Sequence, residues 1–142
     1  MNNSATTRII SKIALEYNGN DKGMAELAAV NFLLSSNPED QFHEMKIVAD
    51  RNSNVEKWAL TGYISPPEEI GKSLSDEELT AIAIEALKKI GVTELNQFRL
   101  DIHNSTKQKH IHFVVNRINI HGKCTVKSRK IGERFGEAVR QI

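Results

Sequence analysis

Residues 98–120 constrain the fold more than any other segment, because they form two alternating runs joined by a short polar loop. Apolar and polar residues alternate over 98–103, and a second alternating run covers 110–120. The six residues between them, 104–109, suit an antiparallel hairpin. Alternation sends successive side chains to opposite faces of a strand. The pattern therefore predicts a β-hairpin with one apolar and one polar face.

Three histidines lie on the polar face of this predicted hairpin. His110 and His112 are two positions apart, so both side chains point to one side of a strand. Antiparallel pairing across the loop can bring His103 beside them. Three imidazoles suit Zn, Mn, Ni or Co, and Mg can serve when a substrate phosphate adds oxygen ligands. Spacing alone leaves an alternative open, in which the histidines only line a polar face and donate to phosphate.

Two further polar residues are expected on the same face. Asp101, two residues before His103, could hold a ligating imidazole through a hydrogen bond. Asn116 is expected on the side of His110 and His112, where it could bind a substrate phosphate or orient an imidazole.

One predicted helix starts at a capping box. Ser75 is followed three residues later by Glu78, and the apolar stripe that follows predicts a helix over 76–90 closed by Gly91. The apolar spacing also predicts two short helices between residues 8 and 34 around a polar turn at 18–23, and a helix over 39–52. Further along the chain we expect a strand over 57–65, a continuation of the sheet over 123–126 and a helix over 129–142. We expect an α+β domain whose central antiparallel sheet has helices packed on one or both faces, in the simplest arrangement on the face opposite the histidines.

Composition fits one globular domain over residues 1–142, with 39% hydrophobic and 26% charged residues. No apolar run could span a bilayer and the polar N-terminus lacks signal-peptide features, so a cytoplasmic protein without membrane contact is expected. The single cysteine, Cys124, excludes an internal disulfide.

Charge is unevenly distributed along the chain. Residues 1–90 carry 9 Lys and Arg against 14 Asp and Glu, a net charge of −5, whereas residues 91–142 carry 10 against 4, a net charge of +6. A basic C-terminal third favours an anionic partner such as nucleic acid, although a solvated basic face would have the same composition. A phosphate track beside the metal could be formed by Lys107, Lys109, Arg117, Lys123, Lys127, Arg129, Lys130 and Arg134.

The histidine segment also resembles a known motif. The string from His103 through His110 and His112 to Asn116 and Arg117 is similar to the metal motif of plasmid and transposon mobilisation relaxases, the HUH endonucleases. The resemblance covers residues 60–141 well and 9–32 more loosely. Similarity to relaxases of Bacteroidetes type extends over 64–69, 74–83, 88–91, 119–123 and 128–131.

The resemblance implies a reaction. In relaxases an early helical tyrosine attacks the phosphodiester at the nick site of a transfer origin and keeps the 5′ phosphate, so that the strand can be rejoined without ATP. Tyr17 matches that tyrosine, and Tyr63 is the only other tyrosine in the chain. The resemblance thus implies metal-dependent, site- and strand-specific nicking and rejoining of single-stranded DNA, with His103, His110 and His112 as ligands. Accessory mobilisation proteins are implied as further partners.

Two departures from the family pattern carry expectations of their own. Residues 1–7 are polar, so the first strand is expected to be shortened or missing. Thr61 and Gly62 occupy the strand where relatives often place a carboxylate facing the metal. Both departures keep open a second function, DNA binding with impaired catalysis. A third class, the replication initiators, usually has its tyrosine on a helix after the hairpin, and no tyrosine follows Tyr63.

Overall fold

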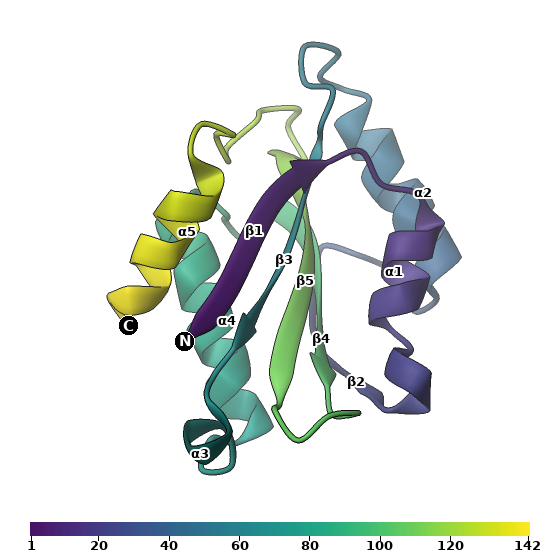
Figure 1. Cartoon of the computed structure of the whole chain (residues 1–142). Helices are drawn as coiled ribbons and strands as arrows, with labels where there is room; N and C mark the ends of the chain where they lie inside the picture. The colour runs from purple at the N-terminus through teal and green to yellow at the C-terminus, as the bar shows by residue number, and fades with distance from the viewer.

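A five-stranded antiparallel sheet forms the centre of the fold (Figure 1). The computed structural model describes residues 1–142. In sequence order the strands are β1 (Asn2–Arg8), β2 (Ala25–Asn31), β3 (Ala59–Ser65), β4 (Asn96–His103) and β5 (His110–Asn119). They lie side by side in the order β1-β3-β5-β4-β2, and every pairing is antiparallel. The predicted α+β class and hairpin are confirmed, and the second hairpin strand is the central strand of the sheet.

The helices are α1 (Lys12–Asn18), the short 3-10 turn η1 (Asp21–Gly23), α2 (Pro38–Ala49), α3 (Glu68–Gly71), α4 (Asp76–Lys89) and α5 (Ile131–Arg140). The capping box of α4 forms as expected: Ser75 Oγ accepts from the Glu78 backbone N–H at 3.0 Å, and the Glu78 carboxylate accepts from the Ser75 N–H at 3.1 Å. None of these helices has the length and apolar character needed to cross a membrane.

Helices cover both faces of the sheet. We call the face that carries the three histidines the histidine face. α4 and α5 pack on the opposite face around a core of 20 buried residues. α1 and α2 pack on part of the histidine face, around a smaller core of 8 buried residues that includes Leu15, Met45 and Val114. Helices on both faces are among the expected arrangements, and the narrower expectation of helices only opposite the histidines is wrong. α1 forms one wall of the site.

Between residues 8 and 34 only the first of the two predicted helices forms. Ala25–Asn31 is instead an edge strand paired with β4, and its register shifts between Leu27 and Ala29. This irregularity puts Leu27 opposite Asp101 and Val30 opposite Arg99, so apolar residues three apart share one face. The bulge therefore gives this strand apolar residues at a spacing that is typical of a helix.

The expectation that the first strand is shortened or missing is also wrong. β1 pairs with β3 over its full length, from Asn2 opposite Ser65 to Arg8 opposite Ala59. Only Ala5 of this strand is buried. The strand is polar because it lies at an edge of the sheet with one face uncovered. The predicted sheet continuation over 123–126 is reduced to an isolated bridge between Ile118 and Cys124.

Candidate metal centre and nuclease site

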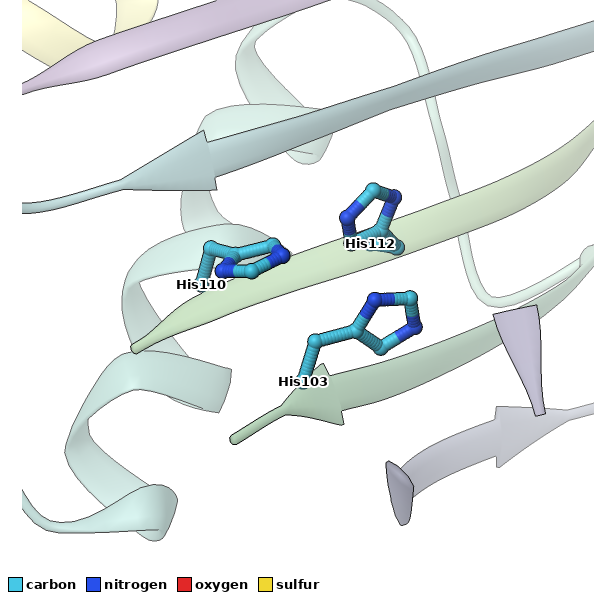
Figure 2. Close-up of side chains that lie close together, drawn as sticks. All are labelled: His103, His110 and His112. Atoms are coloured by element: carbon cyan, nitrogen blue, oxygen red, sulfur yellow. The ribbon is translucent and has the colours of Figure 1, made fainter. Parts of the chain in front are cut away.

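The hairpin brings His103, His110 and His112 together, as the sequence predicted (Figure 2). His103 at the end of β4 pairs directly with His110 at the start of β5. One ring nitrogen from each histidine lies within 4.8 Å of the others. The ring centroids are 4.0 Å apart for His103 and His112, 4.9 Å for His110 and His112, and 5.2 Å for His103 and His110. This triad could hold a metal ion.

Two backbone carbonyls orient two of the rings. Nε2 of His103 lies 2.7 Å from the Asn18 carbonyl oxygen, and Nδ1 of His110 lies 2.9 Å from the Gln108 carbonyl oxygen. A carbonyl oxygen can only accept, so each of these nitrogens carries the ring proton when the imidazole is neutral. Nδ1 of His103 and Nε2 of His110 therefore keep the lone pairs that a metal needs.

His112 is held in its neutral form. Burial lowers its pKa from 6.5 to about 4, and the neighbouring His103 and His110 contribute to the lowering. At neutral pH the imidazole has a free lone pair, because no proton competes for it. Three imidazoles are a borderline donor set, and the residues present thus fit a divalent transition metal.

Asp21 is a site residue that the sequence did not reveal. Its Oδ1 lies 3.9 Å from Nδ1 of His103. The carboxylate also accepts from the Ser105 backbone N–H at 3.0 Å and from the Ser105 hydroxyl at 2.5 Å, which ties η1 to the hairpin loop. Burial raises the pKa of Asp21, but the Ser105 hydrogen bonds outweigh it and hold this pKa below its usual value. An ionised carboxylate therefore stands beside the triad, although β3 supplies none.

Asp101 lies on the histidine face, opposite His112, but its carboxylate is bonded to Arg99. It accepts three hydrogen bonds from that guanidinium at 2.9 to 3.2 Å. Arg99 also donates to Gln41 Oε1 of α2 at 2.9 Å. Both charged side chains are buried, and burial raises the pKa of Asp101 although Arg99 opposes this. Asp101 thus helps to fasten α2 to the sheet, and the structure records no hydrogen bond from it to an imidazole.

Asn116 is likewise buried away from the triad. Its side-chain amide donates to the Met45 carbonyl and to Gln97 Oε1, both at 3.0 Å. Its Oδ1 accepts from the Ile118 backbone N–H at 3.0 Å. Both the donor and the acceptor of the amide are therefore used inside the fold, and neither is directed at an imidazole.

The predicted phosphate track is not continuous beside the triad. Lys107 is exposed in the hairpin loop, but Lys109 pairs with Asp76 at 2.7 Å. Arg117 is buried, and its guanidinium donates to the backbone carbonyls of Val126 and Lys57. The sequence does not reveal these contacts, because alternation predicts which face of the sheet a side chain occupies but not which groups it contacts.

The remaining predicted basic residues lie beyond the opposite end of the sheet from the hairpin (Figure 1). Lys123, Lys127, Arg129 and Lys130 are exposed in the segment between β5 and α5. The seven residue-to-residue steps from His112 to Asn119 span roughly 23 Å of strand. These side chains are therefore too remote to contact a phosphate held by the triad.

Tyr17 lies close to the triad, in the last turn of α1. It is 72% exposed, and it lines a cavity of about 610 Å³ together with Tyr63 and His112. The next residue, Asn18, provides the carbonyl that binds His103. Both tyrosines of the chain therefore border the cavity that opens onto the triad.

The fold and the site define an HUH-type domain. Its central strand, β5, carries two histidines separated by one residue, and the neighbouring strand β4 carries the third. A relaxase family model, described as the MobA/VirD2-like nuclease domain, matches residues 17–142. The chain belongs to this family and is a relaxase nuclease domain, an endonuclease that nicks DNA at a transfer origin. The match begins at Tyr17, includes all three histidines and does not distinguish a Bacteroidetes type. No curated protein and no solved structure matches the chain.

Proposed function

We propose that this domain nicks and rejoins one strand of a transfer origin through a covalent 5′-phosphotyrosyl bond to Tyr17. The observation that carries the proposal is the shared cavity, which has Tyr17 on its α1 wall and His112 on its sheet floor. The bond between Asn18 and His103 supports it, since it ties the helix bearing Tyr17 to the triad.

The reaction is a transesterification. The phenolic oxygen of Tyr17 attacks the scissile phosphorus, the bond from phosphorus to O3′ breaks, and the 5′ phosphate stays on the tyrosine. The phenolic proton passes to solvent and O3′ takes up a proton. Reversal by the same or another 3′ hydroxyl rejoins the strand, because one phosphodiester has been exchanged for another.

We assign His103, His110 and His112 as the ligands of a divalent ion, with Mn, Mg or Zn as candidates. When bound, the ion would polarise the scissile phosphate and stabilise the charge that develops on its oxygens. The residues of the chain prepare this site: the carbonyls of Asn18 and Gln108 orient two rings, and burial keeps His112 neutral. We expect the reaction to occur in the cytoplasm with accessory mobilisation proteins.

A covalent capture experiment tests the nucleophile. Single-stranded oligonucleotides tiled across the DNA that flanks the coding sequence are incubated with the protein and Mn²⁺, and adducts are resolved under denaturing conditions and located by mass spectrometry. The Tyr17→Phe variant should form no adduct, whereas Tyr63→Phe, the matched control from the same cavity, should retain it. An adduct that survives in Tyr17→Phe and disappears in Tyr63→Phe would move the nucleophile to Tyr63.

The second function, DNA binding with impaired catalysis, was suggested by an expected short first strand and a missing carboxylate, and neither reason now supports it. β1 is complete, and Asp21 supplies a carboxylate beside His103. The same capture experiment separates the two functions. A non-catalytic domain would bind the oligonucleotides equally well with a chelator and would give no adduct with any of them.

A further inference from the structure

We propose that the groove between β1, β3 and α1 binds the DNA strand on one side of the scissile phosphate, with Arg8 holding a phosphate there. The β1 groove is the cavity of about 610 Å³ that Tyr17 and His112 border. The proposal rests on the proposed function, because it describes the path of the substrate to the same triad. None of the basic residues singled out in the sequence lies in this groove.

The floor of the β1 groove is a surface of hydroxyl groups. Ser4 and Thr6 of β1 pair with Tyr63 and Thr61 of β3, so the four side chains share one face of the sheet. Tyr63 in turn pairs with His112, which makes this the histidine face. All five residues line the groove. Hydroxyl groups are regular donors to phosphate and sugar oxygens, and they place a strand without reading its sequence.

Arg8 gives the groove its positive charge. Its Nε donates to the Thr61 hydroxyl at 3.1 Å, and the side chain is exposed and forms no ion pair. The bond to Thr61 holds the guanidinium over the floor while its two terminal nitrogens remain open, an arrangement that suits a phosphate. No Asp or Glu lines the groove. A phosphate there would therefore meet a cation and hydroxyl donors without facing a carboxylate.

The wall of the groove formed by α1 and the residues just before it is apolar and exposed. Ile9 is 59%, Ile13 66% and Tyr17 72% exposed, although such side chains usually gain stability by burial. They line the same groove as the hydroxyl floor. A single strand presents phosphates on one side and unpaired bases on the other, and aromatic and apolar side chains accept bases. The groove matches both sides of such a strand.

Tyr63 stands between this groove and a second, smaller cavity. Its ring centroid is 5.8 Å from that of His112. It lines the β1 groove and also a cavity of about 300 Å³ that contains His110, His112 and Gln108. The triad therefore opens in two directions, as a site that cuts within a continuous strand must. The β1 groove receives one side of the strand and the smaller cavity receives the other.

The exposed basic residues before α5 form the rival surface. Lys127, Arg129 and Lys130 line a separate cavity with Glu133 and Glu137. α5 packs against the opposite face of the sheet from the triad. A strand bound there would have to pass around an edge of the sheet to reach His112. This surface therefore offers the matched comparison for Arg8.

Fluorescence anisotropy with a labelled oligothymidylate, in Mn²⁺ and across a salt series, tests the groove. The Arg8→Gln variant should bind about tenfold more weakly, as expected for a lost hydrogen bond to a charged group. Its slope of log affinity against log salt should fall by about 0.7, the loss of one phosphate contact on a single strand. Lys130→Gln removes the same charge from the rival surface and should change neither quantity. Thr61→Val, which keeps the shape of the residue but not the hydroxyl, should weaken binding by a smaller factor.

The groove assignment is overturned if Arg8→Gln binds the oligothymidylate like the unaltered protein, or if Lys130→Gln weakens binding as much. Circular dichroism must show that each variant is folded. If Arg8→Gln does not fold, oligothymidylate binding by Thr61→Val tests the groove independently. If no adduct ever forms but Arg8→Gln still weakens binding, the proposed nucleophile fails and the groove stands. If adducts form normally and Arg8→Gln binds normally, the groove fails and the proposed function stands.

Discussion

The carbonyl oxygen of Asn18 lies 2.7 Å from Nε2 of His103, which bonds the last residue of α1 to the end of β4. This contact places the ring proton of the neutral imidazole on Nε2 and leaves Nδ1 for a metal. It also places Tyr17, the preceding residue, at the border of the cavity that contains His112. One backbone carbonyl thus links the candidate nucleophile with the candidate metal centre.

Replacement of His112 by alanine should abolish tight metal binding. We expect the affinity for Mn²⁺, measured by isothermal titration calorimetry, to fall by more than the roughly 10- to 100-fold that loss of a ligand's hydrogen-bond partner costs. His121, exposed in the turn after β5, is the control, and His121→Ala should bind Mn²⁺ normally. Unchanged binding by His112→Ala would show that the ion is held elsewhere.

Replacement of Asp21 by asparagine should weaken metal binding less, by about tenfold. The amide keeps a similar shape but loses the charge that lies 3.9 Å from Nδ1 of His103. Ser105→Ala is the control, because it removes a donor to Asp21 and leaves the carboxylate in place. Equal losses in the two variants would attribute the effect to the position of the hairpin loop and not to the charge.

The ring of Tyr63 should matter for DNA binding more than its hydroxyl. Loss of a base stacked on an aromatic ring costs about 1 to 3 kcal/mol. We therefore expect Tyr63→Ala to weaken oligothymidylate binding in fluorescence anisotropy, whereas Tyr63→Phe, which loses one hydroxyl of the groove floor and keeps the ring, should weaken it by a smaller factor. Identical affinities for the two variants would exclude stacking at this position.

The buried pair of Arg99 and Asp101 should be sensitive to the loss of one partner. Asp101→Ala leaves a buried guanidinium without its carboxylate, and the free energy of unfolding in urea should fall by about 3 to 5 kcal/mol. Asp50→Ala, which breaks the exposed pair with Lys46, should change it by about 0.5 kcal/mol or less. A similar small effect at both positions would mean that water reaches Arg99.

Acidification should destabilise the metal-free protein through His112. The unfolded chain takes up a proton at this residue below its ordinary pKa of 6.5, whereas burial lowers the pKa in the folded chain to about 4. The unfolded state therefore binds more protons between these values, and stability falls as the pH drops from about 6.5 to about 4. Thermal unfolding in a chelator should show this slope, and His112→Asn should reduce it. An equal slope in the variant would assign the effect to other groups.

Short-range sequence signals predicted the parts of the fold that depend on neighbouring residues. The alternation around His110 and His112 gave the correct strand, and the six-residue loop gave the correct partner for it, because pairing across a short loop involves few alternatives. The capping box at Ser75 likewise marks the start of α4 through hydrogen bonds within four residues.

Long-range pairing explains most of what the sequence could not reveal. Asp21 reaches the triad because Ala25 of β2 pairs with His103, and the sequence near residue 21 contains no signal that predicts this pairing. Arg117 and Asn116 alternate as a strand requires, yet their side chains are buried among carbonyl and amide groups from other segments. The face of the sheet that each side chain occupies could be predicted from its position, but its hydrogen-bond partners come from segments that meet only in the folded protein.

The strand order has a consequence for the segment between β1 and β2. These two strands lie at opposite edges of the sheet, so residues 9–24 cross the whole histidine face and carry Tyr17 with them (Figure 1). α1, with seven residues, is too short to be stable alone. The tyrosine therefore stays in place because Leu15 is packed in the smaller core and the Asn18 carbonyl is bonded to His103. Release of α1 would remove the attacking group and the carbonyl that orients His103, but all three imidazoles would remain on the hairpin of β4 and β5. Strand cleavage should therefore be lost more completely than metal capture.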